Sequence, residues 1–157
     1  MESALHSIGQ VAVTIVGFAA LLKAFNRENV TDPHSDPRLR SIVEQGLVVA
    51  VFCFLPALLI SFNLSSDNAA RLVSGIAAVW LLRWLRILYL IRKAELRSSI
   101  AWRYQMAVVL HVIAFAAFLL SVSGIIGRAQ PFFFSGIVVM LCVVGWAFLA
   151  QFHIERD

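Results

Sequence analysis

Two arginines inside an otherwise apolar stretch are the residues of this chain whose type and spacing most suggest a function. Arg83 and Arg86 interrupt the stretch from Leu72 to Ile91, and Lys93 and Arg97 follow them along the sequence. At about 100° per residue of a helix, the four basic residues fall within an arc of roughly 80°. Such a stripe attracts anions, either lipid phosphates or solutes that enter a polar vestibule.

The stripe has three interpretations. In the first, which we favour, Arg83 and Arg86 extend their long side chains along the helix to reach the lipid head groups. In the second, they face protein and line an anion-attracting vestibule or pair with Glu44. The third, a voltage sensor, is the least supported, because Tyr89 breaks the spacing and every acidic residue lies in a tail, a connection or the end of an apolar stretch.

A second set of polar residues lies in the first apolar stretch of the chain. Gln10, Thr14 and Gly17 share one helical face, which continues to Leu21. This face could line a narrow aqueous path. It could also be a contact between closely packed helices, where small residues and an amide or hydroxyl form interhelical hydrogen bonds, and we favour this packing interpretation.

His111 is the one ionisable residue in the stretch from Met106 to Ile126. A single histidine in such a stretch is more often hydrogen-bonded structure than a proton relay or ligand, although its depth keeps it as a vestibule candidate. Catalysis at this depth needs a nucleophile with a base, or clustered carboxylates, and His111 has no acidic partner in any apolar stretch. We therefore expect no enzyme, no metal site and no cofactor.

The elements that position these residues are five apolar stretches. About 17 to 25 mostly apolar residues are needed for a helix to cross a bilayer, and each stretch is close to that length. Apolar residues make up 61% of the 157-residue chain and charged residues 14%, with a mean hydropathy of +0.85, unlike a soluble domain. The sequence predicts an all-α, polytopic membrane protein with a single transmembrane domain over residues 1–157. The expected spans are about 8–25, 45–64, 69–91, 105–126 and 131–152.

The basic residues of the connections predict the orientation, since short cytoplasmic connections carry an excess of Lys and Arg. With an external N-terminus, only Arg71 and Arg128 lie outside, whereas without the third span the two sides carry eight and five basic residues. We therefore expect five spans, a cytoplasmic C-terminus and a third helix that extends into the cytoplasm. The nine residues expected inside are Lys23, Arg27, Arg38, Arg40, Arg92, Lys93, Arg97, Arg103 and Arg156.

The inner basic surface predicts the partners. The formal net charge of +4 is modest for a chain of this kind, so anionic lipid head groups of the bilayer are expected and nucleic acid is not. Arg92, Lys93, Arg97 and Arg103 are the expected lipid contacts.

Rows of small residues predict where helices pack closely. One row lies on the third expected helix and two lie on the fourth. The residues are Ala70, Ser74 and Ala78 in the first row, and Ala117 with Ser121, then Ser123 with Gly127, in the others.

Four short segments carry a resemblance to known proteins. They are Ile8 to Ala20, Asp36 to Arg40, Pro56 and the ending Ala150-Gln151-Phe152. Together they look like a group of small, uncharacterised bacterial inner-membrane proteins, whose usual start has Gly-Phe-Ala-Gly where this chain has Gly17-Phe18-Ala19-Ala20. The resemblance implies a bacterial inner membrane and supplies no activity or site residue.

Two functions remain as hypotheses. Five short helices leave no room for a path within one chain, so conduction requires a symmetric homo-oligomer. The leading hypothesis is an anion-biased pore for ions or small solutes, lined by Gln10, Thr14 and Gly17 or by Arg83 and Arg86. The alternative is an accessory or scaffolding subunit, whose basic cytoplasmic face binds anionic lipid or a partner protein.

Overall fold

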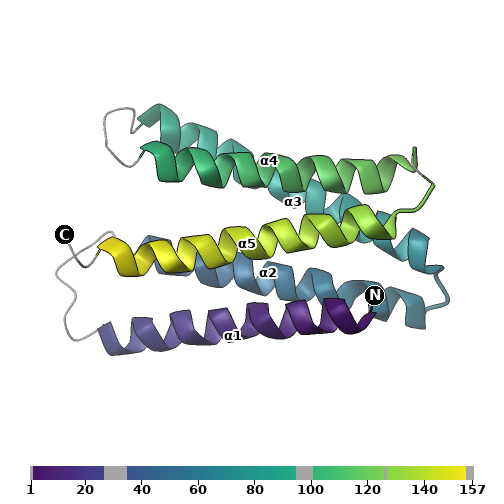
Figure 1. Cartoon of the computed structure of the whole chain (residues 1–157), viewed down its shortest axis with the longest axis horizontal. Coiled ribbons are helices and arrows are strands. Elements are labelled where there is room, and N and C mark those ends of the chain that lie inside the picture. The colour runs from purple at the N-terminus through teal and green to yellow at the C-terminus, as the bar shows by residue number, and fades with distance from the viewer. Residues whose placement is uncertain (1, 27–34, 95–100, 126, 155–157) are drawn as a thin grey trace. The chain divides into compact units, whose positions relative to one another are not determined.

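Five α-helices follow one another along the described part of the chain. The computed structural model describes residues 2–26, 35–94, 101–125 and 127–154. The helices are α1 (Glu2–Asn26), α2 (Ser35–Ser61), α3 (Ser66–Ala94), α4 (Ala101–Ser123) and α5 (Gln130–Ile154) (Figure 1). The predicted all-α fold class is confirmed.

Each helix contains a segment that is long and apolar enough to cross a membrane. The segments are Ser3–Leu21, Ser41–Ser61, Ser66–Tyr89, Gln105–Ser123 and Gln130–Leu149. The third is the longest, at 24 residues, and it contains Arg83 and Arg86. At 1.5 Å per residue, segments of this length suit a hydrocarbon core of about 30 Å, so the chain has the composition of a multi-pass membrane protein.

Three helix ends differ from the expected span bounds, the first being that of α2, which ends at Ser61 where the span was expected to reach about residue 64. The first helix begins at Glu2, earlier than the predicted span, so it includes polar residues that the sequence left outside. The fourth ends at Ser123 rather than near residue 126, because Gly124 adopts a left-handed φ of 65°. Glycine adopts this conformation without a Cβ clash and commonly follows the last helical residue.

The chain divides into two compact units. The first comprises Met1–Phe54 and Leu141–Asp157, and the second comprises Leu55–Met140. The first unit therefore holds α1 with the beginning of α2 and the end of α5. The second holds α3 and α4 with the end of α2 and the beginning of α5.

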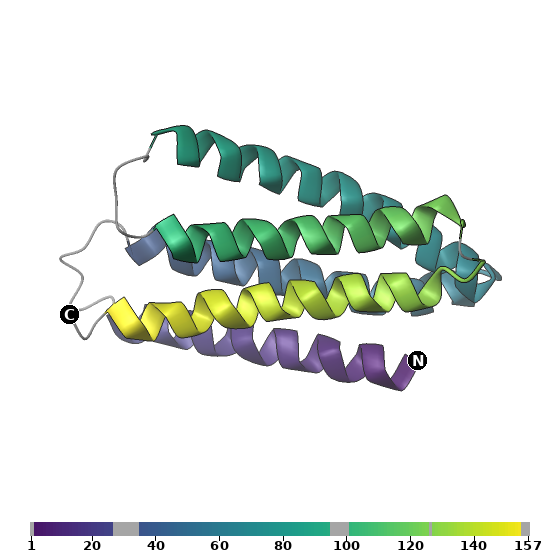
Figure 2. The same cartoon turned by 45° about the horizontal axis from the view of Figure 1, so that its top comes forward.

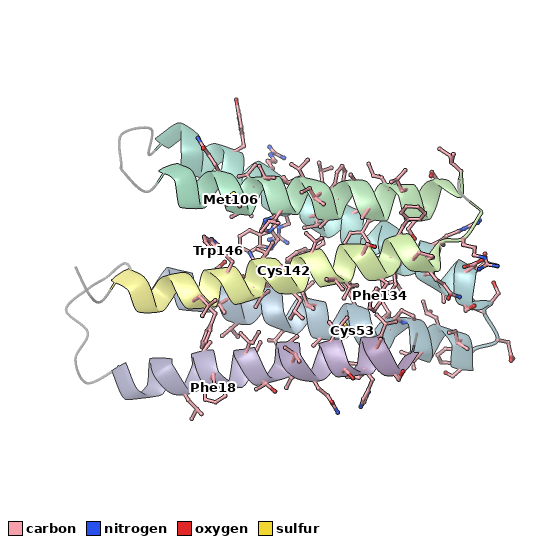
Figure 3. All side chains as sticks on the ribbon, viewed as in Figure 1. Phe18, Cys53, Met106, Phe134, Cys142 and Trp146 are labelled. Carbon is pink, nitrogen blue, oxygen red and sulfur yellow. The ribbon has the colours of Figure 1, made fainter. Side chains whose placement is uncertain are left out.

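In the first unit, α1 approaches α2 closely at two glycines. A Cβ atom on Gly9 would lie 3.0 Å from the ring of Phe54, and one on Gly46 would collide with a methyl group of Val16. The absence of side chains at these positions lets the two helices approach closely, as is common among membrane helices. Phe18 of α1, by contrast, is exposed and points away from the neighbouring helix (Figure 3).

In the second unit, α3 and α4 are packed neighbours (Figure 2). Ala70, Ser74 and Ala78 are all buried, which confirms the predicted close contact along α3. Ser121 of α4 is buried as well, so the row that contains it is also at a contact. The row formed by Ser123 and Gly127 was predicted wrongly: both residues are exposed, and Gly127 lies beyond the end of α4.

A phenylalanine pair joins α4 to the beginning of α5. The rings of Phe118 and Phe133 are both fully buried, with their centroids 6.1 Å apart. Gly136 makes room for Phe118, because a Cβ atom there would lie 2.7 Å from that ring. A tightly filled contact of this kind leaves no space for a larger residue at position 136.

Candidate functional site

The polar residues of α1 lie on a side of the helix that the described residues leave exposed. Gln10, Thr14 and Gly17 are all exposed, although they belong to the candidate membrane-spanning segment of α1. The same side carries further exposed residues, so the polar face of α1 consists of Ser3, Ser7, Gln10, Thr14, Gly17 and Leu21. Their separations alternate between four and three residues. That spacing keeps a face aligned along a helix.

The opposite side of α1 packs within the chain. Leu5, Gly9, Ala12 and Ala19 are buried, and they too follow one another at separations of four, three and then seven residues. Around the helix, this buried side lies roughly 180° from the polar face. The helix is therefore two-sided, with one side used inside the protein and the other left for the surroundings.

Hydrogen bonds on the polar face stay within α1. The Ser7 hydroxyl donates to the Ser3 carbonyl oxygen over 3.0 Å, and the Thr14 hydroxyl donates to the Gln10 carbonyl oxygen over 2.9 Å. The side-chain amide of Gln10 donates to Nε2 of His6 over 3.1 Å. No described residue donates to the side-chain oxygen of Gln10, which remains a strong acceptor on the surface of a spanning segment.

The polar face is open at Gly17. A Cβ atom built there would meet nothing within 4 Å, whereas Gly9 and Gly46 are in close contact with neighbouring side chains. Gly17 is thus a glycine on the uncovered side of the helix. An open glycine in a spanning segment allows another backbone to approach, and no described part of the chain does so.

Arg83 and Arg86 are exposed on α3, within its spanning segment. Two tryptophans lie on the same stretch of helix, with the rings of Trp80 and Trp84 5.8 Å apart between centroids. Tyr89 follows them and is 68% exposed. Aromatic rings with basic side chains are typical of the boundary between hydrocarbon and head groups. The two arginines therefore face lipid or another molecule rather than the interior of their own unit.

His111 is placed differently from the other vestibule candidates, because it is buried in α4. Its Nδ1 lies 2.7 Å from the carbonyl oxygen of Ala107, one turn earlier on the same helix. Because a carbonyl oxygen can only accept, the Nδ1–H of His111 is the donor of this hydrogen bond. The contact supports the structural interpretation of this histidine over a role in a polar path.

Two buried serines form a contact that the sequence did not predict in detail. Ser74 donates to the hydroxyl of Ser121 over 2.8 Å, and Ser121 donates to the carbonyl oxygen of Ala129 over 3.0 Å. Both hydroxyl protons are thus used between α3, α4 and the residue before α5. Within the described ranges, no group of three or more His, Cys, Asp or Glu could hold a metal ion.

Arg71 ends against the carboxyl end of α4. Its guanidinium Nη2 lies 3.2 Å from the position of a Cβ atom on Gly124. The Nε atom of Arg71 is buried without a hydrogen-bond partner among the described residues. A cation at this place interacts favourably with the partial negative charge of the helix end.

The predicted lipid contacts lie outside the described side chains. Arg92 and Lys93 are in α3 and Arg103 is in α4, but their side chains are not described, and Arg97 falls between described ranges. Their interaction with anionic lipid stays a prediction.

No protein-family model matches the chain, and neither a curated protein nor a solved structure matches it. The functional conclusion therefore depends on the residues and their geometry.

Proposed function

We propose that this protein is a non-enzymatic membrane protein that assembles as a homo-oligomer and forms an anion-biased pore for ions or small solutes. The observation that carries the proposal is the outward direction of the polar residues in the spanning segment of α1. Gln10 and Thr14 are exposed there, and the side-chain oxygen of Gln10 has no described partner. A polar group in hydrocarbon is costly without a partner, so a neighbouring subunit or water is expected to cover it.

The filled interior of the second unit supports a path between subunits rather than through that unit. Phe118, Phe133 and Ile137 are fully buried there. The buried polar side chains Ser74 and Ser121 are bonded within the unit and leave no proton to offer to water. A symmetric assembly can instead enclose a polar axis between its protomers.

The arginines of α3 support the anion bias. Arg83 and Arg86 are exposed in a spanning segment, and in the proposed orientation they lie toward its cytoplasmic end. Positive charge at the mouth of a pore raises the local concentration of anions and lowers that of cations.

An accessory or scaffolding subunit is the second candidate. It is favoured by the Trp80–Trp84 pair and the exposed Tyr89 on the same stretch of α3 as the two arginines, because aromatic and basic side chains suit lipid head groups or a partner protein as well as they suit a pore mouth. In that case the contacts between subunits are dry and no solute crosses.

Conduction in liposomes of defined lipid composition tests the pore. We expect purified protein to carry current that favours chloride over potassium, and Arg83→Ala combined with Arg86→Ala to shift the reversal potential toward cations. Arg128→Ala is the matched control, because Arg128 is exposed but lies outside the candidate spans. Silent bilayers that contain a folded oligomer would reject the pore and leave the accessory subunit, which co-purification with a partner in mild detergent would then identify.

We further propose that the protein resides in a bacterial inner membrane with its N-terminus outside and its C-terminus in the cytoplasm. Single cysteines at Ser65 and Ser98, in a chain otherwise free of cysteine, test this with a membrane-impermeant thiol reagent. We expect Ser65→Cys to react from the outside and Ser98→Cys to react only after the membrane is opened. If both cysteines react from the same side, the third helix does not cross the membrane and the proposed orientation is wrong.

A further inference from the structure

The polar face of α1 is exposed, and its described hydrogen bonds all stay within α1. Its members, from Ser3 to Leu21, alternate at four and three residues and average 3.6 residues per turn, so they stay on one side of a straight helix over its whole spanning length. The buried side of α1 packs in its own unit, so a partner for the polar face has to come from outside that unit.

We propose that α1 is the helix through which copies of this chain associate, with its polar face packed in parallel against the same face of a neighbouring copy. The inference rests on the proposed homo-oligomer and names its interface. All copies enter the membrane in one orientation, so their α1 helices run parallel and equal residues meet at equal depth.

The chemistry of the face fits a second copy of itself. A glutamine side chain contains both a donor and an acceptor, so Gln10 of one copy bonds Gln10 of another without any charge between them. The Thr14 hydroxyl keeps its acceptor lone pairs after donating to the Gln10 carbonyl oxygen. The face from Ser3 to Leu21 carries no Lys, Arg, Asp or Glu, so identical copies do not repel one another.

The shape of the face also permits close approach. Open space surrounds Gly17, and the serines at positions 3 and 7 are small. Small residues at this spacing are what membrane helices use to bring their backbones together, and lipid chains cannot replace the hydrogen bonds of Gln10.

Disulfide cross-linking of the full chain in membranes tests the interface. In a background with Cys53→Ala and Cys142→Ala, single cysteines replace Ser7, Thr14 or Gly17 on the polar face. Val11→Cys and Val13→Cys are the matched controls, because both residues are exposed and lie at neighbouring depth on the flanks of the face. We expect a band at twice the 17.4 kDa of the chain for the first three and little for the controls.

A second variant removes the hydrogen bond while it keeps the fold. Gln10→Leu is expected to weaken self-association about tenfold, and Gln10→Asn to restore most of it. Circular dichroism and thermal unfolding of the separated protomer should be unchanged for both, because Gln10 is exposed on the protomer.

The outcomes separate this inference from the proposed pore. Cross-links confined to the polar face in a protein that conducts nothing would support the interface and reject the pore. Cross-links at Val11 or Val13 instead, or an oligomer without α1 cross-links, would overturn the interface and leave conduction to its own test. A band of other mass, from a different membrane protein bound at this face, would also overturn it.

Discussion

The polar side chains of the α3–α4 contact and those on the polar face of α1 differ in their burial and in their hydrogen-bond partners. Ser74 and Ser121 are fully buried, and each hydroxyl proton has a partner on another element. Gln10 and Thr14 are exposed, and their described hydrogen bonds stay on their own helix. Polar groups of the first kind hold a protomer together, whereas those of the second kind are available to something outside it.

The difference separates stability from association. Substitutions at the buried contacts should change the free energy of unfolding of the protomer. Substitutions on the polar face of α1 should leave that energy nearly unchanged and alter only the contacts between molecules. The following variants test this distinction, and the first three have a matched control in the same chain.

Phe118→Ala has the largest expected effect. Phe118 is fully buried between Phe133 and Gly136, so truncation leaves a cavity and costs about 3–5 kcal/mol of unfolding free energy. Unfolding with increasing dodecyl sulfate in lipid micelles measures it. Phe18→Ala is the control, because Phe18 is 57% exposed and should cost much less. Equal losses at the two positions would contradict the assigned burial.

Gly46→Ala and Gly17→Ala should differ in sign. At Gly46 the new methyl group collides with Val16, and overpacking costs about 1–3 kcal/mol, more than the gain of about 0.5–1 kcal/mol from replacing a helical glycine. At Gly17 nothing lies within 4 Å, so only the helix gain remains for the protomer. The same unfolding titration compares them. A destabilised Gly17→Ala protomer would show that this side of α1 is covered within the chain.

Ser74→Ala should lower the unfolding free energy by about 0.6–1.7 kcal/mol, the range for hydrogen bonds between membrane helices. Ser121→Ala removes the same bond, so the double variant should cost less than the sum of the two. Ser135→Ala is the control, because the exposed Ser135 hydroxyl bonds only the Pro131 carbonyl oxygen of its own helix. Additive losses would mean that Ser74 and Ser121 act independently.

Thr14→Ala has the smallest expected effect on the protomer, within about 0.5 kcal/mol. Its hydroxyl donates to the Gln10 carbonyl oxygen of the same helix, so the bond connects α1 to no other element. Analytical ultracentrifugation of the same samples would show whether association changes while unfolding does not. A large loss of protomer stability would mean that Thr14, like the buried serines, stabilises the protomer itself.

The sequence predicted the helices well because a membrane span is a matter of length and apolarity. Each predicted span overlaps one helix, and the third helix runs from Ser66 to Ala94, close to the long helix expected there. The spans expected to reach about residues 64 and 126 run past the ends of α2 and α4. In the fourth, the apolar run continues through Ile125 although the chain turns at Gly124.

The direction of each helical face could not be predicted in the same way. In a soluble protein, polar residues mark the outward side, but a membrane protein is apolar on both its lipid-facing and its inner surfaces. The pattern therefore placed Gln10, Thr14 and Gly17 on one face without showing that this face is uncovered. For His111 it could not distinguish a buried ring bonded to Ala107 from one that lines a path.

The contact between Arg71 and the end of α4 has a consequence for biogenesis. In the proposed orientation, Arg71 must be carried across the bilayer during insertion, which is unfavourable for a basic residue. Its guanidinium then docks beside Gly124, where the helix end attracts a cation. We therefore expect translocation of this connection to be coupled energetically to closure of the α3–α4 hairpin, and an uncharged residue at position 71 to uncouple the two events.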